Sequence, residues 1–158
     1  SRFWAVLIGI DEYASNPLLG CVSDVQLMEK YLTEDLNAPR DRVQLLVGSK
    51  EHTSPEDLIY SSRVHIIDTL LSLIKNPEIA RGDNIVIYYS GHGSCYPFTE
   101  DNEDDETEHI ETLCPIDRDT VGANGEPVPD ISDREFNTIL SLISRAKGNT
   151  IMVILDCC

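Results

Sequence analysis

The sequence predicts an α/β fold, a mostly parallel sheet with helices on both faces, and two patterns lead to this prediction. Apolar runs of strand length alternate along the chain with stretches that have the spacing of amphipathic helices. The apolar runs are hydrophobic at nearly every position, as expected for strands buried on both faces. Such strands need helices above and below them, so three layers are expected. A length of 158 residues fits one domain, spanning 1–158, with a hydrophobic core.

Four strands are expected, with helices between them. The strands are predicted over residues 3–10, 43–47, 85–89 and 150–155. Ser23 and Gln26 are predicted to form a capping box that begins the first helix, since a serine side chain can bind the free amide three positions on. The apolar side of this helix is expected to be Val25, Met28, Leu32 and Leu36.

A second helix is predicted from about Ser62 to Lys75. Upstream of it, residues 53–57 contain a cap, a first-turn proline and two acids, which are the signals of a helix start. The buried stripe of the longer helix is expected to be Val64, Ile67, Leu70, Leu71 and Ile74.

A third helix follows a hairpin turn. Asn124-Gly125 is typical of a tight turn between two short extended segments. Ser132 and Glu135 form a second capping box, and Gly148 ends the helix behind it. Its buried stripe is expected to be Phe136, Ile139, Leu140 and Ile143.

The composition is strongly acidic, with 28 Asp and Glu against 12 Lys and Arg and a formal net charge of −16. This balance argues against binding to nucleic acids or anionic membranes. It is compatible with basic substrates or a divalent cation, and also with a surface that serves only solubility. A mobile loop is predicted over residues 99–111, because like charges repel one another there. Its acids are Glu100, Asp101, Glu103, Asp104, Asp105, Glu106, Glu108 and Glu111.

The cysteines are odd in number and include no Cys-x-x-Cys pair, which favours reduced thiols in a cytoplasmic protein. They are Cys21, Cys95, Cys114, Cys157 and Cys158. No apolar run is long enough to span a membrane. No signal peptide opens the chain, whose first residues lead straight into a strand.

Two short phrases at the ends of apolar runs carry reactive side chains. His92 stands between two glycines just after one predicted strand, and Cys157-Cys158 follow Asp156 just after another. The carboxyl ends of parallel strands meet at one edge of a sheet, where ligands bind. An imidazole beside a thiol can favour the thiolate, so the pair predicts a cysteine hydrolase. The structural alternative is a glycine-rich turn and core thiols. The other histidines, His52, His65 and His109, lack such a context and are expected at the surface.

These phrases resemble the motifs of a known family. Ser90-Gly91-His92-Gly93 and Asp156-Cys157-Cys158 are similar to the His and Cys motifs of the metacaspases, within the caspase-like cysteine peptidases. Further matches lie at 5–10, 19–24 and 115–117, and the likeness is strongest to fungal caspase-domain proteins. The resemblance implies a Cys-His dyad with His92 as general base. It implies Cys158, two positions after the aspartate, as nucleophile, and the amides of Gly93 and Cys158 as an oxyanion hole.

The resemblance also implies an endopeptidase that cleaves protein or peptide substrates after Arg or Lys. The acidic pocket for the basic side chain is expected from Asp24, Asp156 and Ser90. A pair of carboxylates matches a guanidinium in charge and in bidentate geometry. The alternative for Asp24 is an acid that merely favours the first turn of a helix. A pocket for Asp, as in animal caspases, needs arginines, and residues 14–24 contain none.

Many metacaspases need calcium, and acidic residues give hard oxygen ligands for it. The expected ligands are Asp133, Asp104 and Asp105, although the usual Asp-Asp pair before the last helix reads Asp133-Arg134 here. A calcium activator and a loop without metal are therefore both open, and the peptidase chemistry itself needs no cofactor.

The chain ends at the expected nucleophile, so it corresponds to the large-subunit part of the family's domain. The small-subunit strands, which follow in the family, are an expected partner because they cover the far edge of the sheet. Either processing or truncation accounts for this end, and the isolated chain can then lack activity. A second hypothesis is a catalytically silent caspase-fold scaffold or signalling module. A nucleotide-binding domain is a weak third, because no Gly-x-Gly-x-x-Gly follows the first strand.

Overall fold

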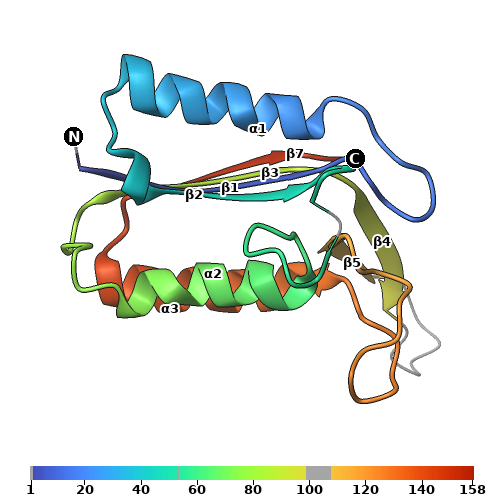
Figure 1. The fold of residues 1–158 in the computed structure, drawn as a ribbon. Helices are drawn as coiled ribbons and strands as arrows, with labels where there is room; N and C mark the ends of the chain where they lie inside the picture. The colour runs from blue at the N-terminus through green and yellow to red at the C-terminus, as the bar shows by residue number, and fades with distance from the viewer. Residues whose placement is uncertain (1, 53, 99–107) are drawn as a thin grey trace.

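The predicted α/β sheet is present. The computed structural model describes residues 2–52, 54–98 and 108–158. Four parallel strands lie in the order β2-β1-β3-β7. They are β1 (Phe3–Ile10), β2 (Val43–Gly48), β3 (Asn84–Ser90) and β7 (Ile151–Asp156). Helix α1 (Cys21–Lys30) covers one face, and α2 (Arg63–Lys75) and α3 (Asp133–Lys147) cover the other (Figure 1).

The strands divide the core into two layers because their side chains alternate between the faces. On β1, Trp4, Val6, Ile8 and Ile10 pack on the α2–α3 side, whereas Ala5 and Leu7 pack with Val25 of α1. The start of α1 lies very close to β1 at Gly9. A Cβ on Gly9 would lie 2.5 Å from Val25 Cγ2 and 2.6 Å from the Cys21 carbonyl, so only glycine fits there.

The start of α1 differs from the prediction. The helix begins at Cys21 after Gly20, which has φ 108°, and Ser23 lies inside it. The hydroxyl of Ser23 donates to the Gly20 carbonyl and does not cap an amide. Instead, the Asp11 carboxylate accepts from the Cys21 amide at 2.9 Å and the Val22 amide at 3.4 Å. The predicted capping box is therefore wrong, because an acid at the end of β1 already binds these amides.

The other two helices begin as predicted. The Ser62 hydroxyl accepts from the His65 amide, and the Ser132 hydroxyl accepts from the Glu135 amide. The buried stripe of α3 is confirmed at Phe136, Ile139 and Ile143, with Leu140 half-buried.

Three predictions around α2 and the hairpin had different outcomes. In the predicted α2 stripe, Leu70 is buried, and Ile67, Leu71 and Ile74 are partly buried against the core, as expected. Val64 is wrong, because it is 61% exposed, and Ile66 and Leu73 are buried in addition. Residues 54–60 form turns and not a helix, and Thr53 lies outside the described residues. The turn at Asn124-Gly125 is confirmed by an antiparallel bridge between Val121 and Pro127.

A second sheet was not predicted. It is antiparallel, in the order β4-β5-β6, and consists of β4 (Gly93–Phe98), β5 (Glu108–Leu113) and β6 (Ile131–Ser132). Residues 108–111 of the predicted mobile loop lie in β5, so the prediction was wrong there, and 99–107 are outside the described residues. Short turns of π helix (Tyr31–Asp35) and 3-10 helix (Arg40–Arg42) complete the fold. No helix in the described ranges has the length and apolarity to cross a membrane.

Candidate active site

The two motifs with reactive side chains, around His92 and around Cys157-Cys158, extend from neighbouring strands. Strands β3 and β7 pair in parallel with Ser90 opposite Asp156, so His92 and Cys158 each lie two positions beyond the last pair. The next residue, Gly93, lies against the end of the chain. A Cβ on Gly93 would lie 2.3 Å from the Cys158 carbonyl oxygen and 3.4 Å from the Cys157 sulfur. The absence of a side chain at Gly93 is therefore what lets the two segments meet.

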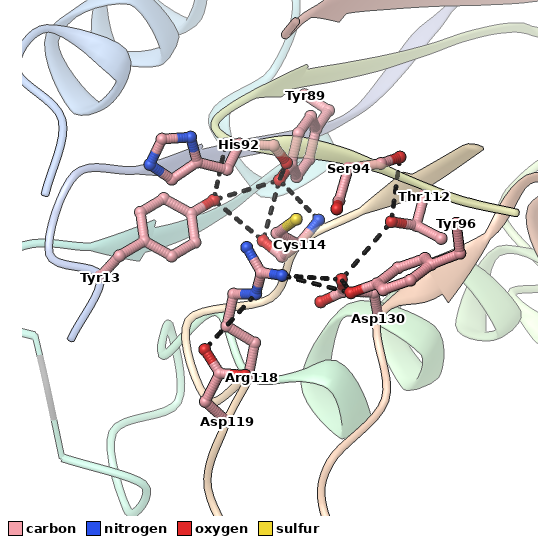
Figure 2. Close-up of polar contacts among 10 residues, drawn as sticks. All are labelled: Tyr13, Tyr89, His92, Ser94, Tyr96, Thr112, Cys114, Arg118, Asp119 and Asp130. Carbon is pink, nitrogen blue, oxygen red and sulfur yellow. Dashed lines mark hydrogen bonds and ion pairs between the residues drawn. The ribbon is translucent and has the colours of Figure 1, made fainter. Parts of the chain in front are cut away.

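The imidazole of His92 is held on one side by a backbone carbonyl. Its Nε2 lies 2.7 Å from the Asn16 carbonyl oxygen. A carbonyl only accepts, so Nε2 carries the hydrogen and Nδ1 is the unprotonated nitrogen of the neutral ring. The ring also packs on the Tyr13 ring with centroids 4.6 Å apart, as Figure 2 shows. The described residues include no hydrogen bond from this ring to a cysteine.

The two adjacent thiols have different surroundings. Cys158 is exposed, whereas Cys157 is half-buried and packs against the core. Burial raises the pKa of the Cys157 thiol, and the neighbouring Cys158, Asp156 and Glu111 raise it further. Both cysteines line a cavity of about 550 Å³ that also contacts Gly93. A raised thiol pKa lowers the fraction of thiolate, so the local electrostatics disfavour Cys157 as a nucleophile. All five cysteines are free.

The acidic residues of the predicted pocket converge on the α1 side of the sheet. Asp24 in the first turn of α1 and Asp156 at the end of β7 are exposed, and Ser90 is buried. The hydroxyl of Tyr88 lies 3.5 Å from an Asp156 carboxylate oxygen. Burial raises the pKa of Tyr88, and the charges of Asp156 and Asp24 raise it further while a hydrogen bond with Ser90 lowers it. The Tyr88 hydroxyl therefore interacts with all three residues of the predicted pocket, Asp24, Asp156 and Ser90.

The sequence analysis missed two members of this cluster, Tyr88 and Cys21. Burial raises the pKa of the Cys21 thiol; Ser90 lowers it by a hydrogen bond, and the carboxylates of Asp11 and Asp24 raise it. Strand alternation could have found Tyr88, because it lies on the same face of β3 as Ser90, two positions away. Cys21 needed the correct start of α1, which depended on Asp11 ten positions earlier.

Of the three expected calcium ligands, only Asp133 lies among the described residues. No group of three His, Cys, Asp or Glu side chains that could hold a metal occurs in residues 2–52, 54–98 and 108–158. Asp133 starts α3 and accepts from the Arg134 amide, and Asp104 and Asp105 lie outside the described residues.

The other three histidines were all predicted at the surface. His109 is exposed, as predicted. His52 and His65 are partly buried instead: His52 Nδ1 lies 2.6 Å from the Asp57 carboxylate, and His65 Nδ1 lies 2.8 Å from the Tyr60 carbonyl.

A solved structure of a protein from Geobacter sulfurreducens has the same fold, with a TM-score of 0.68 and 20% identity over 100% of this chain and 51% of that chain. Metacaspase-1A of Aspergillus oryzae is 30% identical over 114 residues, which are 72% of this chain and 25% of that protein. Metacaspase-3 of Arabidopsis thaliana is 31% identical over 155 residues, which are 98% of this chain and 38% of that protein.

The chain spans about a quarter to two fifths of the length of these two curated relatives. Fungal and plant proteins occur among them at similar identity, so the likeness to fungal proteins is confirmed and extends to plants. A model of the metacaspase peptidase C14 domain matches residues 4–158, and this chain therefore belongs to the metacaspase family.

Proposed function

We propose that this chain is the catalytic large-subunit part of a cysteine endopeptidase that cleaves after Arg or Lys. The observation that carries the proposal is the pairing of Ser90 with Asp156 at the ends of adjacent strands. His92 and Cys158 each follow this pair by two residues. The contact between Gly93 and the Cys158 carbonyl brings the two segments together. The whole protein's activity is a proposal because the chain covers only part of its relatives.

In the proposed mechanism, Nδ1 of His92 takes the proton from the Cys158 thiol, and the thiolate attacks the scissile carbonyl. The bond from Nε2 to the Asn16 carbonyl supports this direction, because it leaves Nδ1 as the basic nitrogen. His92 then returns the proton to the leaving amine, and an acyl-enzyme forms that water hydrolyses. The amides of Gly93 and Cys158 are proposed to donate to the oxyanion.

Cys158 is the proposed nucleophile, and Cys157 its neighbour. Exposure of Cys158 and the raised pKa of Cys157 both support this assignment. Access matters because a substrate carbonyl must reach the sulfur, and a thiol that titrates higher gives less thiolate at neutral pH.

Asp24 and Asp156 are proposed to bind the basic side chain before the scissile bond, with Ser90 beside them. The convergence of their charges on Tyr88 supports a single acidic pocket. Two carboxylates favour a guanidinium or an ammonium over a carboxylate side chain by charge alone.

The free edge of β7 is proposed to pair with a further strand of the full-length protein, the small-subunit segment. The exposed apolar residues Met152 (60%) and Leu155 (51%) on this strand support a covering partner. Five free thiols support a reducing, cytoplasmic location, and calcium as an activator stays a prediction.

The test uses the full-length protein with fluorogenic peptides that differ only in the residue before the scissile bond. Arg and Lys peptides are expected to be hydrolysed, and the Asp peptide is not. Cys158→Ala is expected to abolish hydrolysis, and the matched variant Cys157→Ala is expected to retain it. Activity that survives Cys158→Ala would overturn the assignment of the nucleophile.

A scaffold without catalysis is the second candidate, favoured by the absence of a ring–thiol hydrogen bond within the described part of the chain. An arginine chloromethylketone separates the two candidates. Irreversible labelling of Cys158 with Cys157 spared supports the peptidase. A full-length protein that neither hydrolyses the peptides nor reacts at Cys158 is a scaffold.

A further inference from the structure

We propose that Tyr13 and Tyr89 are positioning residues for the general base, because their hydroxyls hold both peptide groups of His92. The inference rests on the proposed function only for the role of His92 as a base. The hydrogen bonds themselves are features of the fold, drawn in Figure 2.

The two tyrosine hydroxyls and the backbone amides and carbonyls of His92 and Cys114 form a closed ring of hydrogen bonds. The His92 amide donates to the Tyr13 hydroxyl at 2.9 Å, and this hydroxyl donates to the Cys114 carbonyl at 2.9 Å. In the opposite direction, the Cys114 amide donates to the Tyr89 hydroxyl at 3.1 Å, and that hydroxyl donates to the His92 carbonyl at 2.7 Å. In this arrangement each hydroxyl accepts one hydrogen bond and donates one. Further contacts cross the ring: the Cys114 amide also lies 3.0 Å from the His92 carbonyl, and the Tyr89 hydroxyl lies 2.9 Å from the Cys114 carbonyl and 3.1 Å from the Tyr13 hydroxyl.

Both hydroxyls must stay protonated for the ring to form, and the surroundings favour this. Tyr13 is 4% exposed and Tyr89 is 1% exposed. Burial raises the pKa of Tyr13 and of Tyr89 well above the ordinary value for tyrosine. A satisfied polar network in the interior is rigid because each missing bond leaves a buried group unpaired.

Tyr13 reaches His92 at a second point. Its ring packs on the imidazole at 4.6 Å between centroids, and the same loop supplies the Asn16 carbonyl that binds Nε2. The loop after β1 therefore holds the backbone of His92 with a hydroxyl, its ring face with an aromatic ring, and its Nε2 with a carbonyl. These three contacts fix the direction of Nδ1.

The glycine before His92 is explained by the same ring. A Cβ on Gly91 would lie 2.6 Å from the Tyr13 hydroxyl and 2.8 Å from the Tyr89 hydroxyl. Any side chain at Gly91 would thus displace the hydroxyls that bind the next residue.

The test is Tyr13→Phe in the full-length protein, which keeps the ring and removes the hydroxyl. Tyr60→Phe is the matched control, since Tyr60 is also buried (8% exposed) and lies outside the ring of hydrogen bonds. We expect Tyr13→Phe to lower kcat for an Arg peptide by about 10- to 100-fold with KM within about twofold, as for a misplaced catalytic group. The acid limb of the pH–rate profile is expected to shift. Tyr60→Phe is expected to change neither kcat nor the profile.

A second readout does not depend on activity. In protein labelled with ¹⁵N-histidine, the His92 signals, assigned by their loss in His92→Gln, are expected to report the Nε2–H tautomer. Tyr13→Phe is expected to give a mixture of tautomers, and Tyr60→Phe is not. If Tyr13→Phe does not fold, the kinetic and tautomer measurements are made on Tyr89→Phe, with the same results expected.

The outcomes separate the two proposals. A folded Tyr13→Phe variant with an unchanged tautomer and an unchanged pH–rate profile overturns the positioning role. If the wild-type protein hydrolyses no peptide, the proposed function fails, and the tautomer comparison alone then decides the positioning role.

Discussion

Strands β3 and β7 are neighbours and end at the same edge of the sheet, but their ends are held in opposite ways. At the end of β3, Ser90 is 1% exposed, and just beyond it both peptide groups of His92 are bound by buried hydroxyls. At the end of β7, Asp156 is exposed, and so is Cys158 two positions later. The contacts of this second end are longer or lie on an exposed segment: the Gly91 amide donates to the Asp156 carbonyl at 3.3 Å, the Tyr88 hydroxyl lies 3.5 Å from the Asp156 carboxylate, and Gly93 lies against the Cys158 carbonyl.

The difference indicates that this chain preorganises the proposed base, His92, more than the proposed nucleophile, Cys158. The position of His92 is fixed by contacts with segments far away in the sequence, through a network that costs free energy to break. The position of Cys158 is fixed less firmly, because the segment that carries it is exposed. We therefore expect substitutions near His92 to affect folding and catalysis together, and substitutions near Cys158 to affect mainly catalysis.

The two glycines that flank His92 give the sharpest test and the largest expected effect. Gly91→Ala forces a methyl group against two buried hydroxyls. We expect it to lower the free energy of unfolding by about 3 kcal/mol, the upper end of the usual cost of overpacking. Urea unfolding measures this loss.

Gly93→Ala is the counterpart at the other end. Its methyl group would meet the Cys158 carbonyl, which is on an exposed segment that can shift. We expect a loss of less than about 1 kcal/mol in the free energy of unfolding, with a slower reaction of Cys158 with an alkylating agent. Equal losses of stability in the two variants would contradict the comparison.

The two ends of β3 are also held differently. A buried carboxylate, Asp83, holds the amino end, whereas the neutral hydroxyls of Tyr13 and Tyr89 hold the carboxyl end. The Asp83 side chain is 3% exposed and accepts from Arg2 Nε, from Trp4 Nε1 at 3.1 Å and from the Ala80 amide at 2.9 Å. Burial acts to raise the pKa of Asp83, but these hydrogen bonds and the Arg2 charge outweigh it, and the pKa is lowered.

The lowered pKa of Asp83 makes the stability of the fold depend on pH. A carboxyl group whose pKa is lower in the folded state stabilises the fold above its unfolded pKa of about 3.9, and this stability is lost as the pH falls through the folded pKa. We expect Asp83→Asn to cost about 2 kcal/mol at pH 7, as for a charged hydrogen bond, and the difference from wild type to shrink in acid.

Urea unfolding of both proteins across the acidic range measures this change. Asp68→Asn, at an exposed site on α2, is the matched control and should show no such trend. A wild-type advantage that stays constant with pH would show that the charge of Asp83 does not contribute.

Signals that are local in the sequence predicted most of the parallel sheet and two of the three helix starts. Ser62 and Ser132 cap amides three positions away, so a short window contains the whole interaction. The start of α1 escaped the prediction because its cap, Asp11, is ten positions before Cys21. The antiparallel sheet also escaped it, because β4 contains glycine and proline and β6 has two residues.

In the candidate site, too, the features with local signals were predicted and those that depend on distant residues were not. Strand ends and motif spacing were enough to select His92, Cys158 and the acidic residues. The hydroxyl bridge was not predictable, because Tyr13 and Cys114 are 101 positions apart and neither has a local pattern. Tyr89 was predicted as a strand residue, but only the packed structure shows that its hydroxyl meets the peptide groups beyond the strand.

The end of β1 provides the smallest test and a third kind of support at this edge of the sheet. Here a charged side chain, Asp11, holds the start of a helix instead of a loop. We expect Asp11→Ala to cost about 1 kcal/mol of unfolding free energy, as for loss of a helix cap. Ser23→Ala should cost less than about 0.5 kcal/mol, because its hydroxyl donates to a carbonyl on the exposed first turn. Urea unfolding of the two variants ranks them, and a larger loss for Ser23→Ala would restore the capping box that the sequence suggested. With the expected ranking, three of the four strand ends at this edge differ in what fixes them: neutral hydroxyls at β3, a carboxylate at β1, and glycine contacts at β7.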